Sequence, residues 1–152
     1  MKMFLTVSIV TIASIAATAI GQPKPEASEY LKTKGGGAIT DTADQTGRMY
    51  LGLVLQWVKQ PPTGAMVVAE FENTENGAAP YLVEQPVNVA EATLTLRSPL
   101  YPCVLNNSHY NVTVKVFSDA AKTQQIGTHE QQIQFALPKR QLKTLKLREC
   151  GA

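Results

Sequence analysis

Two histidines, His109 and His129, are the side chains of this 152-residue chain best suited to acid–base chemistry near neutral pH. His129 is followed by Glu130, but a zinc-protease motif needs a second histidine four positions on, where this chain has Ile133. The Gly-x-Ser-x-Gly nucleophile motif is absent from the sequence. We therefore expect a protein that is not an enzyme, with both histidines in surface hydrogen bonds. A small hydrolase that uses either histidine is the alternative.

The carboxylates are scattered along the chain. Glu70 and Glu72 alternate in one apolar segment, and Asp41 and Asp44 lie in a polar one. A glycosidase needs two carboxylates that face each other across a cleft, and a calcium loop needs densely spaced acidic residues. Neither pattern occurs, so we interpret these residues as solvated positions on strands and loops. No metal and no cofactor are expected.

Two cysteines, Cys103 and Cys150, are the remaining reactive groups, and neither has a second Cys or His at metal-ligand spacing. In an oxidising compartment they would most simply pair with each other. Closing a loop of roughly 50 residues would stabilise the fold by roughly 4 kcal/mol in the chain-entropy model. The bridge would also tie the C-terminal segment to the body. The sequence leaves open whether the pair forms within one chain or between two.

The N-terminus has the pattern of an export leader. A positive charge at Lys2 precedes an apolar run over residues 3–20 that no charged residue interrupts. Small residues close the run and fit cleavage after Ala19 or, preferably, after Gly21. We expect residues 1–21 to be a cleavable signal peptide, with an uncleaved membrane anchor as the alternative. The expected location is extracellular or periplasmic, with membrane contact only through this segment before cleavage.

The whole chain is nearly neutral, with 14 basic and 12 acidic residues. A dedicated nucleic-acid binder normally has a strong basic excess, so no nucleic-acid partner is expected. One local exception lies near the C-terminus, where five cations face a single acid, Glu149. The five are Lys139, Arg140, Lys143, Lys146 and Arg148. We interpret them as a solvated edge or tail, with a polyanion-binding patch as the alternative.

The middle of the chain consists of short apolar segments separated by turn signals. Residues 22–47 contain the glycine triplet 35–37 and few large apolar side chains, which favours a flexible lead-in, with one loosely attached first strand as an option. Alternation of apolar and polar residues is clearest over 110–116. The strands we expect are 49–58, 65–71, 81–87, 92–96, 110–116 and 125–137. Together they predict an all-β antiparallel sandwich over residues 48–152.

The order of these segments supports a narrower fold assignment. The segment 53–57, which ends in Trp57, is followed by the turn 61–64 and by the apolar segment 67–71. Leu94 and Leu105 then precede the segment 110–114, which begins with Tyr110. In this order the chain resembles a fibronectin type III domain, or more broadly an immunoglobulin-like sandwich, over residues 48–137. The resemblance implies that Trp57 and Tyr110 are core residues. The disulfide and a strand-like segment over 144–150 depart from that family.

Two tripeptides fit the N-glycosylation acceptor pattern: Asn106-Asn107-Ser108 and Asn111-Val112-Thr113. We expect Asn106 to lie in a loop, which makes it the preferred acceptor. Asn111 would face solvent on the side opposite the valines, so it is also allowed.

These observations favour a non-catalytic binding module that recognises an extracellular or periplasmic protein or glycan through its loops. The loops expected to do so are 61–64, 73–80 and 118–124. One alternative is a secreted inhibitor of a hydrolase, with 60–64 as its inhibitory loop. Another is a structural subunit of a surface assembly, in which the segment 22–47 adds a strand to a neighbouring molecule.

Overall fold

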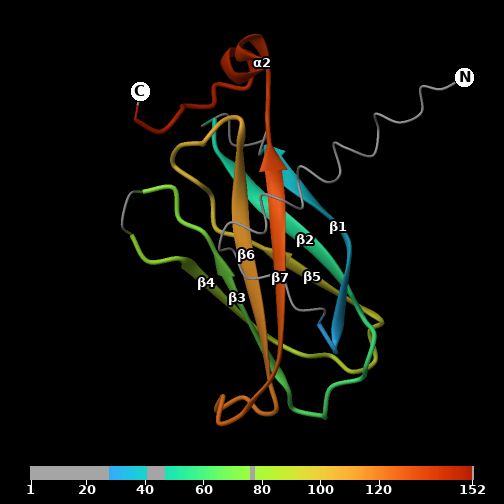
Figure 1. The fold of residues 1–152 in the computed structure, drawn as a ribbon. Helices are drawn as coiled ribbons and strands as arrows, with labels where there is room; N and C mark the ends of the chain where they lie inside the picture. The colour runs from blue at the N-terminus through green and yellow to red at the C-terminus, as the bar shows by residue number, and fades with distance from the viewer. Residues whose placement is uncertain (1–27, 41–46, 76–77, 152) are drawn as a thin grey trace, which may run out of the picture.

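The structure, a computed structural model, describes residues 28–40, 47–75 and 78–151; the expected signal peptide lies outside them. Within this part of the chain the elements are β1 (Leu31–Thr40), β2 (Met49–Trp57), β3 (Met66–Phe71), β4 (Tyr81–Pro86), β5 (Thr93–Arg97), β6 (Ser108–Phe117), β7 (Gln125–Phe135) and α2 (Lys139–Thr144). The strands form two antiparallel sheets, in the order β1-β2-β5 and β4-β3-β6-β7 (Figure 1). The expected all-β class is confirmed, and each of the six expected strands is present with slightly different ends.

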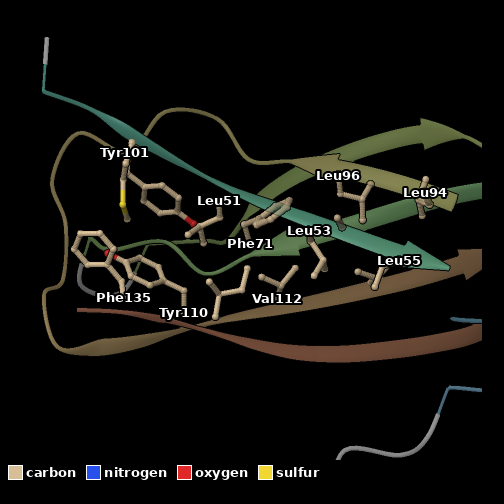
Figure 2. Close-up of a cluster of buried hydrophobic side chains, with 14 of the residues drawn as sticks. Leu51, Leu53, Leu55, Phe71, Leu94, Leu96, Tyr101, Tyr110, Val112 and Phe135 are labelled. Atoms are coloured by element: carbon tan, nitrogen blue, oxygen red, sulfur yellow. The ribbon is translucent and has the colours of Figure 1, made fainter. Parts of the chain in front are cut away.

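A shared hydrophobic core lies between the two sheets. Side chains of a strand alternate between its two faces, so every second residue of β2 and β6 points inward. The inward residues with no exposed surface are Met49, Leu51, Leu53 and Leu55 on β2, and Tyr110, Val112, Val114 and Val116 on β6. Figure 2 shows the β2 leucines facing the β6 side chains, with Phe71 of β3 among them. Each fully buried leucine or valine contributes about 1.5–3 kcal/mol.

Four aromatic side chains form a column at one end of this core. Tyr101 packs edge-on against Tyr81 and Tyr110, at centroid distances of 5.3 and 5.4 Å, and Tyr110 packs against Phe135 at 6.4 Å. Burial raises the pKa of the Tyr101 and Tyr110 hydroxyls, so both stay protonated. Tyr110 is fully buried, whereas Trp57 is half-buried at the end of β2 and packs against the rim of the core.

The segment 22–47, expected to be a flexible lead-in, contains the strand β1. This strand is not loosely attached, and it places the start of the sandwich before residue 48. β1 pairs with β2 along its length, so the sheet begins at Leu31. The strand includes the glycine triplet 35–37, and one of these glycines, Gly36, lies close to β2. A Cβ at Gly36 would lie 3.1 Å from a methyl carbon of Leu53 and 3.2 Å from the carbonyl oxygen of Gly52. Close approach of the two backbones therefore favours glycine there.

Side chains also join β1 to β7, the neighbouring edge strand of the other sheet. The Tyr30 ring covers Gly127, where a Cβ would lie 2.9 Å from a ring carbon. Further along both strands, Thr33 Oγ1 lies 2.8 Å from His129 Nε2 and donates a hydrogen bond to Gln131 Oε1 at 2.7 Å. The two edge strands thus run in the same direction along this seam, and the sheets are linked where they would otherwise be open.

The C-terminal segment differs from the expected strand over 144–150. Pro138, which has no N–H to donate, follows the last strand and begins α2, and Leu142 of this helix is buried in the core. Beyond the helix, up to the last described residue 151, a single bridge forms, between Val104 and Glu149 in parallel orientation. Leu145 therefore ends the helix and Leu147 lies buried in the turn after it. The prediction of a further strand over 144–150 was wrong.

A disulfide joins Cys103 to Cys150 within one chain, as the simplest pairing predicted. Hydrogen bonds flank it on both sides: Val104 N donates to Arg148 O at 2.8 Å, and Cys150 N donates to Val104 O at 2.9 Å. Leu147 is buried beside them. The C-terminal segment is consequently fastened to the connection between β5 and β6.

Candidate functional site

The three loops expected to carry recognition leave the sheets at two different ends. Met66 of β3 pairs with Pro86 of β4 and Phe117 of β6, so the connections 58–65, 87–92 and 118–124 all leave at one end. We call these three connections the loop end (Figure 1). The loop 72–80 leaves at the opposite end, where the Thr74 hydroxyl lies 3.7 Å from Cys103 Sγ. We call that region, with the disulfide and α2, the disulfide end.

Contacts between connections hold the loop end together. Val87 N donates to Ala65 O at 3.0 Å, and Gln60 Nε2 donates to Val89 O at 2.6 Å. An ion pair ties Lys122, in the turn before β7, to Glu84 of β4. The loop end is therefore one braced surface made from connections that are far apart in the sequence.

Sequence reasoning missed the middle connection, 87–92. Its turn is built by Asn88, whose Oδ1 accepts a hydrogen bond from Ala90 N at 3.1 Å and whose Nδ2 donates to Glu91 Oε1 at 3.1 Å. Asparagine is a strong turn former because its side chain can bond the backbone two residues on. This signal was available in the sequence between two apolar segments.

Charged groups of the loop end are engaged by partners within the described chain. Lys59 pairs with Glu29, Glu91 accepts from Asn88, and Lys122 pairs with Glu84. Asp119 accepts hydrogen bonds from the hydroxyl and the N–H of Thr123, and these bonds hold the pKa of its carboxyl below its usual range. The charged groups of the loop end thus already have partners within the chain. The neutral side chains are the ones available for contact with another molecule.

The neutral surface of the loop end combines apolar and small side chains with a few polar ones, among them Thr63 and Gln124. Val58 is 63% exposed and Val89 37% exposed. Trp57 N donates to Ala92 O at 3.1 Å, which sets Val58 beside the 87–92 connection. The other exposed small or apolar residues there are Pro62, Gly64, Ala90, Ala92, Ala120 and Ala121. Such a surface suits contact with another apolar surface more than with a charged ligand.

The two histidines do not come together. His129 points toward β1 and is half-buried, and His109 is exposed on the other face of the same sheet, opposite Gln134. The Thr33 hydroxyl donates its proton to Gln131, so His129 Nε2 donates to Thr33. Burial lowers the pKa of His129. Among the described residues no group of three metal-binding side chains forms.

The two candidate glycosylation acceptors, Asn106 and Asn111, differ in exposure, and the difference favours Asn111 over Asn106, which the sequence had favoured. Asn106 is half-buried, and both ends of its amide are used: Nδ2 donates to Leu137 O at 3.0 Å, and Oδ1 accepts from Leu137 N at 2.9 Å. Asn111 is exposed, and its Nδ2 donates to Glu72 Oε2 at 2.7 Å. The Asn111 amide is also bonded at both ends, since Gln132 Nε2 donates to its Oδ1 at 3.0 Å. The two acceptors therefore differ in exposure, and Asn111 is the more accessible one.

A hollow of about 510 Å³ lies at the disulfide end, beside the expected loop 73–80. Its lining residues are Glu72, Asn73, Thr74, Glu75, Ala78, Pro80 and Leu105. One of its two carboxylates is already engaged, because Glu72 Oε2 accepts from both the backbone and side-chain nitrogens of Asn111, each at 2.7 Å. The hollow is thus a depression in which one of the two carboxylates, Glu72, serves the fold.

No protein-family model matches this chain, and no curated protein matches it either. In the described part of the chain, no helix has the length and apolar character needed to cross a membrane.

Proposed function

We propose that the fold is an immunoglobulin-like sandwich close to the fibronectin type III type. The orders β1-β2-β5 and β7-β6-β3 follow the strand orders A-B-E and G-F-C of immunoglobulin domains, with β4 beside β3. A second support is Tyr110, near the start of β6, whose hydroxyl accepts a hydrogen bond from Leu105 N at 2.6 Å. This is the arrangement of the tyrosine corner found in such sandwiches.

We further propose that the protein is a non-catalytic binding module that recognises a protein partner through the loop end. The observation that carries the proposal is the convergence of three connections whose charged groups all have partners within the chain and whose exposed side chains include Val58 and Val89. Recognition commonly lies on loops that a rigid scaffold holds in place. A glycan partner is the alternative, because Thr63 and Gln124 of the same connections are exposed polar residues.

The proposed location is extracellular or periplasmic. The disulfide supports this, because such bonds persist in oxidising compartments and are rare in the cytosol. A cleavable leader over residues 1–21 is the second element of this proposal, and it rests on the sequence pattern.

Two alternative functions have weaker support. An inhibitory loop is expected to be extended, whereas Ala65 N donates to Pro62 O at 3.1 Å and closes a turn there. A subunit that lends its N-terminal segment to a neighbour needs that segment free, whereas β1 is already paired with β2 in the same chain.

The test is a crosslinking pull-down with the oxidised mature protein as bait, repeated with two paired variants. V58S/V89S removes the two exposed valines of the loop end. The matched control, I39S/L82S, changes two aliphatic residues of similar exposure, 45% and 60%, on the outer faces of the two sheets. Both variants should keep the wild-type circular dichroism spectrum. Loss of the captured protein with V58S/V89S alone supports the proposal, and equal capture by all three proteins contradicts it. Selective binding to a glycan array would replace the protein partner by a glycan.

A further inference from the structure

We infer that the disulfide end carries a second, independent binding surface, for an acidic polysaccharide. Its cationic residues, which we call the basic cap, are Arg48, Lys139, Arg140, Lys143, Lys146 and Arg148, and all six are exposed. The inference does not depend on the loop end, which lies at the opposite end of the sheets (Figure 1).

The helix α2 arranges three of these cations on one side. Lys139 and Lys143 are four residues apart and Arg140 and Lys143 three apart, which are the spacings of neighbours on a helix surface. Leu142, on the same helix, is buried in the core, whereas the three cations are exposed. The helix therefore lies on the body by its leucine and presents its cations outward.

A close backbone contact adds the start of β2 to this surface. A Cβ at Gly47 would lie 1.8 Å from the carbonyl oxygen of Lys146, and Gly47 has a φ of 68° that favours glycine. Arg48, the next residue, is thereby held beside the turn that carries Lys146 and Arg148. Cations from two distant parts of the sequence share one end of the molecule.

The backbone under the basic cap is fastened at several points. Leu137, just before the helix, is bonded on both sides by Asn106. Arg148 O accepts from Val104 N, and the disulfide holds the segment two residues later. A fixed backbone reduces the entropy lost when the cations bind a ligand together. The arrangement thus provides a preformed charged surface at the end of the domain.

The cations of the basic cap have no ion-pair partner among the described residues, whereas three lysines elsewhere on the surface do. Lys59, Lys115 and Lys122 are each paired with a glutamate. No described carboxylate forms an ion pair with a residue of the basic cap. Six cations held close together repel one another, so an external anion that joins them is favoured.

The surroundings of the cations point to a polysaccharide with repeated carboxylate or sulfate groups. Insertion into a membrane surface needs apolar side chains exposed among the cations, whereas Leu142 and Leu147 are buried and Leu145 is half-buried. The strongly exposed apolar residues of this end, Ile39 and Leu82, lie on the outer faces of the two sheets. Single-stranded nucleic acid needs aromatic side chains for stacking beside the cations, and α2 with the turn after it, residues 139–151, contains no aromatic residue. A flexible, hydrophilic polyanion needs only spaced cations, which the basic cap offers.

The test measures binding of the full oxidised protein to immobilised heparin and polygalacturonate, with neutral dextran as the blank. The variant K139Q/R140Q/K143Q removes half of the basic cap. The matched control K32Q/K34Q/R97Q removes the same charge from exposed positions of β1 and β5. We expect the first variant to bind roughly tenfold or more weakly at low salt, with the slope of log affinity against log salt reduced by about two to three. The control should stay close to wild type.

Three outcomes would overturn the inference. The first is no binding of the wild type to either polyanion at low salt. The second is equal weakening by both triple variants, since binding would then follow net charge and not this surface. The third is retention on vesicles that contain phosphatidylglycerol without retention on either polysaccharide, which would assign the basic cap to a lipid surface. Both variants should show the wild-type melting temperature, so that loss of the fold is excluded.

Discussion

Replacing both cysteines by serine should lower the free energy of unfolding by about 4 kcal/mol. The bridge joins residues 47 positions apart. In the chain-entropy model a loop of that length removes about 13–14 cal/mol/K from the unfolded chain, which gives this value at room temperature. For a domain of this size the melting temperature should fall by about 15 °C. The loop encloses β6, β7 and α2, so the loss should affect the whole fold.

The assay is urea unfolding of C103S/C150S and of the wild type with and without reductant. The chain has one tryptophan, and Trp57 lies half-buried on β2, outside the segment that the bridge encloses. Its fluorescence therefore reports the sheets and not the tethered tail. The reduced wild type serves as the control, because it should match the double variant without any change of sequence.

The reasoning would be refuted by a fluorescence transition that shifts by less than about 1 kcal/mol while trypsin cleaves the C-terminal segment rapidly. That result would mean that the bridge restrains only the tail. A smaller loss in the double variant than in the reduced wild type would instead point to effects of the serines themselves.

Three further changes test single contacts. Tyr110→Phe leaves the Leu105 N–H without its partner and should lower the free energy of unfolding by about 1–3 kcal/mol, measured by urea unfolding. Gly47→Ala should destabilise the fold by more than the roughly 1 kcal/mol typical of an unfavourable φ, because its Cβ would also strike Lys146; a thermal melt checks this. The pKa of His129 is lowered by burial, so the unfolded chain binds the proton more readily. Stability should therefore fall as the pH drops through the ordinary titration range of histidine, and His129→Gln should flatten the difference in urea midpoint between about pH 7.5 and about pH 5.5.

The strands of the second sheet could be predicted because each has a strong local pattern. In β6 the alternation of Tyr110 and the valines with polar residues indicates which face is buried, and the structure buries that face. The disulfide followed from the presence of two cysteines and the expected compartment. The local sequence pattern was sufficient to predict a strand where alternating side chains determine which face is buried.

The elements that the sequence did not predict depend on contacts between distant segments. β1 contains a glycine triplet without apolar alternation, and it forms because Gly36 allows the backbone of β2 to approach. α2 is a six-residue helix without a side-chain cap, and burial of Leu142 holds it. The loop end likewise needed the strand order, because its three connections are neighbours only in the folded molecule.

The disulfide also determines how the domain would respond to a pulling force on its two ends. Tension that enters at the N-terminal side and leaves after Cys150 would pass through the covalent bridge and bypass everything between the two cysteines. The 47-residue span between them would not be extended, so the fully stretched molecule would be shorter by about 160 Å. Only the segment up to Cys103, which contains β1 to β5, could be extended by the force. The strands β6 and β7 lie between the two cysteines and would therefore bear no tension.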